Sequence, residues 1–247
     1  MSVSLNDLYD YLPLKIYQNE NYFKFSLDSV LLAEFVKNPH KSKHILELCS
    51  GNSAVSMILS TKTDTHITCV EVQPEICDLA KKSIEYNKLS DKITLINSDI
   101  SDINNYFPGN NYDIIVCNPP YFKKNSSSLV NNDMVKAIAR HEIKTNLEDI
   151  IKISSKILSK NGELYMVHRS ERIDEIINYC HKYDINVKNI QFITTKEDAN
   201  PMLVLVRAVK GSNFGVKINP YLCINDLKTF KNIFWKEWFY EINSWFR

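Results

Sequence analysis

The chain has 247 residues, of which 44% are hydrophobic and 24% are charged. These proportions are ordinary for a globular protein, and the length suits one large domain with a full core. The formal net charge of +1 provides no global attraction for nucleic acid, so any contact with RNA has to come from local patches.

The cysteines and the N-terminus bear on where the protein works. The six cysteines include no close pair of the kind that binds a metal, which argues against a zinc enzyme and a secreted disulfide scaffold. The N-terminus carries Asp7 and Asp10 without a basic, apolar signal segment, and no apolar stretch is long enough to span a bilayer. We therefore expect a soluble cytoplasmic protein that binds neither a metal nor a membrane.

The first predicted elements are a helix and a strand that ends in a tight turn. Apolar residues at helical spacing predict a helix over Ser26 to Lys37. The run His44 to Leu48 predicts a buried strand that leads into Cys49-Ser50-Gly51-Asn52-Ser53 and a helical pattern from Ala54. Glycine in such a turn lets the backbone approach a ligand closely, and N–H groups at a helix start favour electron-rich groups.

The next two predicted strands each end at an acidic residue. His66 to Val70 leads to Glu71, about 20 residues after Gly51, where nucleotide-binding βαβ units place an acceptor for ribose hydroxyls. Lys92 to Asn97 leads to Ser98-Asp99-Ile100, where an acid beside an apolar residue suits an adenine amino group and ring face. Either acid alone is weak evidence, because such residues are usually solvated or cap a helix.

The fourth predicted strand, Tyr112 to Cys117, runs directly into Asn118-Pro119-Pro120-Tyr121. Proline lacks an N–H and biases the preceding residue toward extended geometry, so the Asn118 side chain and the Pro119 carbonyl can both accept hydrogen bonds from one amino group. Tyr121 or Phe122 can stack on the ring that carries this group. The alternative is a simple strand-ending turn, since all these residue types end strands.

The rest of the chain continues as alternating helices and strands. Pro74 opens a helix through about Asn87, and Lys124 to Asn132 predicts a polar loop. The elements that follow are a helix over Asn146 to Leu158, a turn at Asn161-Gly162, a strand over Glu163 to His168, a helix over about Glu171 to Lys182, and strands over Asn186 to Thr194 and Pro201 to Val209.

The last segment, Asn225 to Arg247, carries an aromatic stripe at helical spacing. It indicates a packing face rather than an RNA platform. Further aromatic residues on its other faces could be covered by a partner subunit or by nucleic acid, so both a monomer and a homodimer stay open.

The chain resembles the class I methyltransferases that use S-adenosylmethionine, and within them the amino-methylating group marked by Asn-Pro-Pro-Tyr. The likeness extends from about Ser26 to Val209. A closer resemblance is to the bacterial tRNA1(Val) (adenine-37 N6) methyltransferases. The segments that carry it are FSLDSVLLAEF at Phe25 to Phe35, ELCSGNSAV at Glu47 to Val55, NPPYF at Asn118 to Phe122, ARHE at Ala139 to Glu142 and VHRSER at Val167 to Arg172.

The resemblance implies a fold and an activity. The implied fold is a Rossmann-like α/β domain with a doubly wound, mostly parallel seven-stranded sheet and N- and C-terminal helical additions. The implied activity is methylation of a tRNA adenine at N6. We expect one domain over residues 1–247, divided into a cap (1–38), a catalytic core (39–210) and an aromatic helical extension (211–247).

The resemblance implies a catalytic group and a cofactor-binding group, and the basic and aromatic residues near the motif suggest a group that binds tRNA. The catalytic group holds the adenine and comprises Asn118, Pro119, Pro120 and Tyr121. The group that binds S-adenosylmethionine comprises Ser26, Asp28, Glu47, Cys49, Gly51, Asn52, Ser53, Glu71, Val72, Asp99, Ile100 and Asn118. The group that binds tRNA comprises Tyr121, Phe122, Lys123, Lys124 and Arg140, and His141 or Lys37, Lys41 and Lys43 would extend its surface.

The first turn departs from the wider family pattern. It has only one glycine, and Ser53 stands where another glycine is common; serine there is strained if its φ is positive. Two alternatives to tRNA methylation stay open: methylation of a release-factor glutamine or a DNA adenine, and a non-catalytic RNA-binding protein. A dinucleotide oxidoreductase is disfavoured because the sequence contains no G-x-G-x-x-G.

Overall fold

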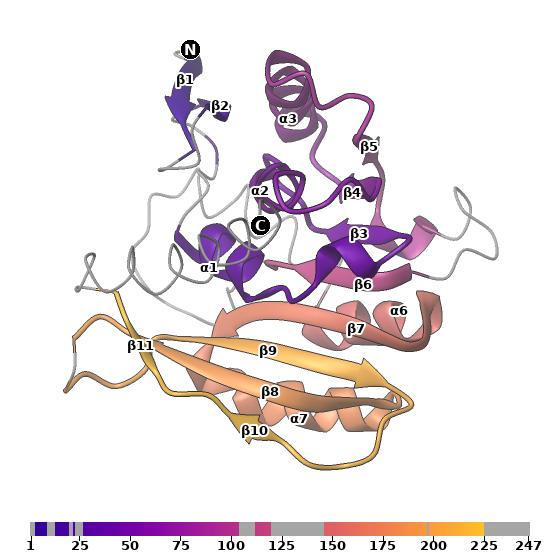
Figure 1. Ribbon diagram of the computed structural model, residues 1–247, viewed down its shortest axis with the longest axis vertical. Coiled ribbons are helices and arrows are strands. Elements are labelled where there is room, and N and C mark those ends of the chain that lie inside the picture. The colour runs from indigo at the N-terminus through magenta and orange to yellow at the C-terminus, as the bar shows by residue number, and fades with distance from the viewer. Residues whose placement is uncertain are drawn as a thin grey trace, which may run out of the picture.

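One mixed sheet of nine strands organises the part of the chain that the computed structural model describes, which is residues 3–8, 13–19, 22, 27–103, 112–119, 146–196 and 198–224. The strand order is β10-β8-β9-β7-β6-β3-β4-β5, and β11 also pairs with β8 (Figure 1). The strands are β3 (Ile45–Leu48), β4 (Ile67–Glu71), β5 (Ile93–Asn97), β6 (Tyr112–Cys117), β7 (Leu158–Arg169), β8 (Ile185–Thr194), β9 (Leu203–Lys210), β10 (Lys217–Ile218) and β11 (Leu222–Cys223).

The pairing confirms the predicted doubly wound α/β fold. Strands β5, β4, β3, β6 and β7 are parallel, and β9 is antiparallel to both β7 and β8. The short strands β10 and β11 pair parallel with β8 and were not predicted. They place part of the expected C-terminal extension in the sheet, whereas the helix expected over Asn225 to Arg247 lies outside the described residues.

Helices cover both faces of this sheet because its strands alternate their side chains. Ile45 of β3 faces one core cluster and Leu46 faces the other. The first cluster lies under the helices that precede β6, and the second under those that follow it (Figure 1). The helices are α1 (Leu27–Phe35), α2 (Ala54–Leu59), α3 (Pro74–Tyr86), α6 (Leu147–Ile157) and α7 (Ile173–Lys182).

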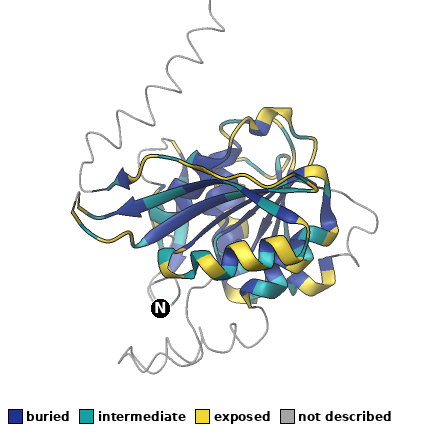
Figure 2. Cartoon of the chain, turned by 90° about the horizontal axis from the view of Figure 1, so that it is seen from below, coloured by how far each residue is buried: buried dark blue, intermediate teal, exposed yellow. Residues whose placement is uncertain are grey.

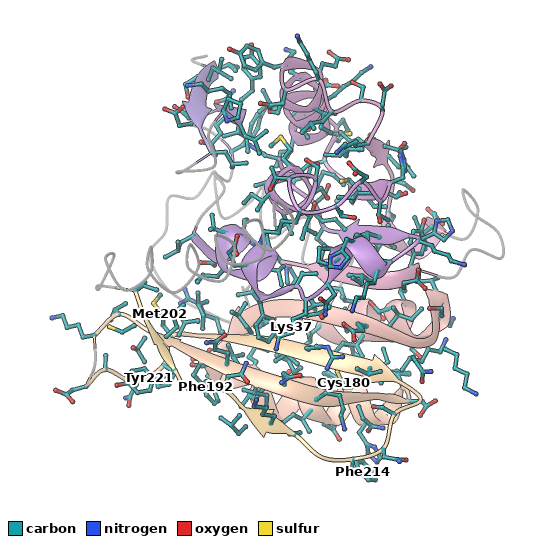
Figure 3. The ribbon with its side chains drawn as sticks, viewed as in Figure 1. Lys37, Cys180, Phe192, Met202, Phe214 and Tyr221 are labelled. Atoms are coloured by element: carbon teal, nitrogen blue, oxygen red, sulfur yellow. The ribbon has the colours of Figure 1, made fainter. Side chains whose placement is uncertain are left out.

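Burial follows the same layers: the central strands are buried, and the outer faces of the helices are exposed (Figure 2). At the outer edge beside β10, Phe214 and Tyr221 are 75% and 55% exposed (Figure 3). The described residues thus form a core of helix on sheet on helix, the layering expected when strands alternate with helices.

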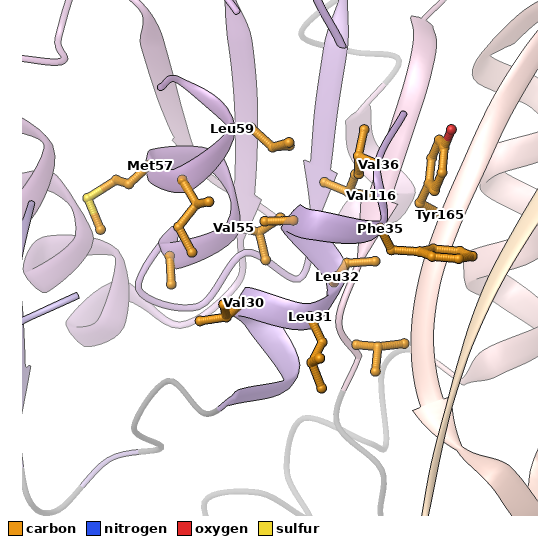
Figure 4. Packing of buried hydrophobic residues seen from close by; sticks show 14 of the residues in the cluster. Val30, Leu31, Leu32, Phe35, Val36, Val55, Met57, Leu59, Val116 and Tyr165 are labelled. Atoms are coloured by element: carbon orange, nitrogen blue, oxygen red, sulfur yellow. The ribbon is translucent and has the colours of Figure 1, made fainter. Parts of the chain in front are cut away.

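Helix α1 confirms the predicted N-terminal helix and fixes its position against the sheet. Val30 and Leu31 are almost fully buried, and the ring of Phe35 meets that of Tyr165 on β7 edge to face at 5.9 Å (Figure 4). Each fully buried side chain of this size contributes about 1.5–3 kcal/mol. The first turn of α1 lies beside the carboxyl end of β6, where Ser29 Oγ accepts a hydrogen bond from Asn118 Nδ2.

The chain before α1 forms a hairpin that was not predicted. Strands β1 (Val3–Asp7) and β2 (Lys15–Asn19) pair antiparallel. The hairpin is bound to α3, because the Lys15 N–H donates to Asn87 Oδ1 at 2.9 Å and the Tyr17 N–H donates to Ser83 Oγ at 2.9 Å. The division into cap, core and extension stays a prediction.

The predicted punctuation at Asn161-Gly162 lies within a strand, so the predicted strand start at Glu163 is wrong. Strand β7 begins at Leu158, directly after α6, and its register against β6 shifts beyond the pair Tyr112 and Leu158. Asn161 has a φ of 64°, and a Cβ on Gly162 would lie 2.9 Å from the Ser159 carbonyl oxygen. The two residues therefore make an irregularity within the strand, where a positive φ and a missing side chain are needed as much as in a turn.

Candidate active site at the carboxyl edge of the sheet

Four parallel strands bring most of the predicted site residues to one edge. Leu48 of β3 is in register with Val70 of β4 and with Cys117 of β6, and Glu71 is in register with Asn97 of β5. The residues that follow these strands therefore meet at the carboxyl edge, where open α/β sheets bind ligands.

In the turn after β3, every second residue has a positive φ. Its positive φ angles are 54° at Cys49, 52° at Gly51 and 58° at Ser53. Left-handed geometry costs a residue with a Cβ about 1–2 kcal/mol, so Cys49 and Ser53 are strained. The sequence left open whether Ser53 is strained, and its positive φ shows that it is. Strain of this kind is common where a backbone is shaped to clamp a ligand.

Glu71 connects the tip of β4 to this turn. Its Oε2 accepts the Gly51 N–H at 2.8 Å, and its Oε1 accepts the Gln73 N–H at 2.9 Å. The residue is 4% exposed, and burial raises the pKa of its carboxyl. Each carboxylate oxygen has two lone pairs, so Glu71 keeps capacity to accept ribose hydroxyls. The next residue, Val72, is half-buried.

The Glu47 side chain is bound by α2 and β4. Its Oε2 accepts hydrogen bonds from the Ser56 N–H at 3.0 Å, from the Ser56 hydroxyl and from the Cys69 thiol at 3.7 Å. Burial raises the pKa of this carboxyl to about 7, although the bonds from Ser56 and Cys69 oppose the rise. Its carboxylate therefore supports the start of α2, and a direct contact with a cofactor stays a prediction.

The polar side chains of Asn52 and Asp99 are bound by other parts of the protein. Asn52 is 6% exposed, and its Nδ2 donates to the Tyr17 carbonyl on β2 at 3.1 Å. Asp99 Oδ1 accepts the Ser101 N–H at 3.0 Å, so Asp99 caps the short helix Ile100–Asp102. Helix capping was one of the usual roles expected for an acidic residue at this position. Ile100 is 5% exposed and packs in the second core cluster. Binding of a cofactor by these three residues stays a prediction.

Asn118 lies at the tip of β6, beside the first turn of α1. Its Nδ2 donates to Ser29 Oγ at 3.3 Å. Pro119 is buried, and Asp28 precedes Ser29 in the same helical turn. Sequence reasoning missed Ser29, because nothing in a helical pattern identifies a contact made 89 residues away.

Several predicted site residues lie outside the described residues. They are Ser26, Pro120, Tyr121, Phe122, Lys123, Lys124, Arg140 and His141.

Of the lysines before β3, Lys43 lies near the starts of β3 and β6, at the edge opposite Asn118. The Lys43 N–H donates to Asp113 Oδ2 at 2.7 Å, near the start of β6, and the Lys37 N–H donates to the Tyr165 hydroxyl. Lys41 is in the short helix Pro39–Lys41, which precedes β3. The sequence-based expectation that these three lysines extend the phosphate-binding surface of Lys123 and Lys124 stays a prediction, because Lys123 and Lys124 lie outside the described residues.

Two further observations concern the described residues alone. They contain no group of three or more His, Cys, Asp or Glu side chains arranged to hold a metal ion. No helix among them has the length and apolar character that crossing a membrane requires.

Residues 23–192 match the family model described as "Methyltransferase small domain". One similar curated protein is the tRNA1(Val) (adenine(37)-N6)-methyltransferase of Parabacteroides distasonis, with 23% identity over 81% of this chain and 83% of the relative. Another is the tRNA1(Val) (adenine(37)-N6)-methyltransferase of Aeromonas hydrophila, with 26% identity over 77% of this chain and 78% of the relative. Similar solved structures are a predicted O-methyltransferase of Agrobacterium tumefaciens (TM-score 0.63, 22% identity, 80% of this chain and 88% of that one) and P. horikoshii TYW2 in complex with MeSAdo (TM-score 0.58, 16% identity, 85% and 72%). These likenesses support the class I methyltransferase fold.

Proposed function

The chain belongs to the methyltransferase small domain family, and we propose that it transfers a methyl group from S-adenosylmethionine to N6 of an adenine in tRNA. The relatives named above act, by name, on adenine 37 of tRNA1(Val). We propose the same nucleotide here. Because tRNA is the substrate, we also propose that the enzyme works in the cytoplasm, as a monomer or a homodimer.

The observation that carries this proposal is the position of Asn118. It follows β6 at the carboxyl edge and precedes a buried proline, and its side-chain amide is bound to Ser29. The same edge holds the left-handed turn at Gly51 and the carboxylate of Glu71. The proposed acceptor for the substrate amino group, Asn118, therefore lies at the same edge of the sheet as the residues proposed to bind the nucleoside, Gly51 and Glu71.

The residues around Gly51 fit the nucleoside part of S-adenosylmethionine. A Cβ on Gly51 would meet no heavy atom of the described residues within 4 Å, so within this part of the chain glycine is needed for its φ rather than for packing. Glu71 adds a buried carboxylate that can accept from ribose hydroxyls. When bound, this cofactor supplies a sulfonium methyl group that a nucleophile can attack.

Asn118 and Pro119 would act on the adenine amino group through hydrogen bonds. The lone pair of this nitrogen is delocalised into the ring, so the nitrogen is a weak nucleophile. Acceptors at Asn118 Oδ1 and the Pro119 carbonyl would hold both N–H bonds and favour a pyramidal nitrogen, whose lone pair is available for attack. Such positioning can account for several kcal/mol of a barrier of this kind, on the order of 7–11 at most. The methylated nitrogen then releases its proton to water.

The remaining site residues keep their predicted roles as parts of this proposal. Pro120 would rigidify the motif, and Tyr121 or Phe122 would stack on the adenine, which an anticodon loop presents unpaired. Lys123, Lys124 and Arg140 would contact phosphates.

Methylation of total unmodified tRNA with labelled S-adenosylmethionine tests the proposal. We expect label in N6-methyladenosine, mapped to position 37. Label in a DNA adenine or a release-factor glutamine, with none in tRNA, would support the alternative substrates. Binding of S-adenosylmethionine without any turnover would support a non-catalytic RNA-binding protein.

A further inference from the structure

We propose that Ser29 is a positioning residue, which fixes the orientation of the Asn118 side-chain amide so that its oxygen faces the adenine amino group. This inference rests on the proposed function, because it assigns the Asn118 oxygen the role of acceptor.

The hydrogen bond between the two side chains holds the amide plane with its nitrogen toward Ser29. Asn118 Nδ2 lies 3.3 Å from Ser29 Oγ, and an amide nitrogen can only donate, so the serine oxygen is the acceptor. The amide oxygen is attached to the same planar group and faces away from Ser29. A rotation of the amide by 180° would turn its N–H groups toward a substrate that itself offers N–H groups, and such a pair repels.

Ser29 suits this task because the rest of the molecule holds it in place. It is 6% exposed and lies in the first turn of α1, directly before the buried residues Val30 and Leu31. A side chain on a packed helix is held more firmly than one on a loop. Helix α1 also contacts β7 through Phe35 and Tyr165, so the serine is fixed relative to the sheet that carries Asn118.

Two constraints from different parts of the chain therefore act on Asn118. Pro119 restricts its backbone to extended geometry. Ser29 restricts the rotation of its side chain. Removing Ser29 leaves the acceptor present but removes one hydrogen bond that orients the amide, so the rate of methyl transfer should fall while binding of the cofactor is unchanged.

The test compares kcat and the dissociation constant for S-adenosylmethionine in single variants. We expect Ser29→Ala to lower kcat by about fivefold to tenfold, the factor that one net hydrogen bond contributes, with the dissociation constant unchanged. Ser29→Thr keeps the hydroxyl and should retain most of kcat. Ser154→Ala on α6 is the matched control, because Ser154 is likewise a buried helical serine, and its hydroxyl has no hydrogen-bond partner among the described residues.

A double-mutant cycle separates positioning from a general loss of packing. In an Asn118→Ala background, Ser29→Ala should have no further effect on kcat, because the amide that it orients is gone. An equal fall in both backgrounds, or no fall in the wild-type background, would overturn the inference. If the wild type itself makes no N6-methyladenosine, the proposed function fails; if it does and Ser29→Ala retains full kcat, only this inference fails.

Discussion

The carboxylate of Glu71 accepts the Gly51 N–H at 2.8 Å and so binds the tip of β4 to the turn after β3. The same carboxylate accepts the Gln73 N–H, so both of its oxygens are oriented by backbone donors. One buried side chain thus shapes the turn and keeps lone pairs for ribose hydroxyls.

Replacing Glu71 by alanine should weaken binding of S-adenosylmethionine about tenfold to a hundredfold, the range for loss of hydrogen bonds to a charged group. Isothermal titration with the cofactor measures this change. Glu75→Gln is a suitable control, because Glu75 is exposed in the first turn of α3. Unchanged affinity in Glu71→Ala would remove Glu71 from the cofactor site.

Glu47 should make stability depend on pH. Burial raises its folded-state pKa from 4.5 to about 7, so the folded protein holds this proton more tightly than the unfolded chain. The resulting stability is complete below about pH 4.5 and is lost as the pH rises through about 7. The variant Glu47→Gln has no carboxyl group to titrate at this position. The difference between its free energy of unfolding and that of the wild type should therefore shift in favour of the variant by about 2–3 kcal/mol between pH 5 and pH 8.5.

Chemical denaturation at both pH values measures this difference for Glu47. The exposed Glu85 on α3 provides the control Glu85→Gln, whose stability should stay parallel to that of the wild type. A constant difference between Glu47→Gln and the wild type across the range would contradict the pKa of Glu47.

Ser53→Gly should stabilise the protein. Ser53 has a φ of 58°, and glycine adopts this geometry without a Cβ penalty. A gain of about 1 kcal/mol corresponds to a rise in Tm of about 2–4 °C for a chain of this size. The control is Ser50→Gly in the same turn, where φ is not positive and glycine should lower Tm. The idea of strain at Ser53 fails if Ser53→Gly lowers Tm as much as Ser50→Gly.

Gly162→Ala should destabilise the protein by about 1–3 kcal/mol, because its Cβ would lie 2.9 Å from one carbonyl oxygen and 3.0 Å from another. Thermal unfolding measures the loss, and Lys160→Ala on the exposed part of the same strand should change Tm little. Equal Tm values for the two variants would show that the strand can rearrange around the added methyl group.

The sequence predicts the strands of the site well, because each is a short apolar run that ends at polar or turn residues. The predicted strand Tyr112 to Cys117 is confirmed by β6 with the same bounds, and His44 to Leu48 is confirmed within one residue. Parallel order then implies that Gly51, Glu71 and Asn118 meet at one edge.

Contacts between distant segments could not be predicted in this way. Ser29 contacts Asn118 across 89 residues of sequence. Asn52 contacts Tyr17 on the N-terminal hairpin, which was not predicted because its first strand, Val3–Asp7, has largely polar residues. The error at Asn161-Gly162 has another cause: this dipeptide indicates a positive φ, and an irregularity inside a strand needs one as much as a turn does.

The most direct test of the central claim is the rate of N6-methyladenosine formation on tRNA by Asn118→Ala. If the Asn118 oxygen holds the amino group, kcat should fall at least tenfold, about 1.4 kcal/mol of transition-state stabilisation, while affinity for S-adenosylmethionine changes little. A variant that forms N6-methyladenosine at the wild-type rate would contradict the account.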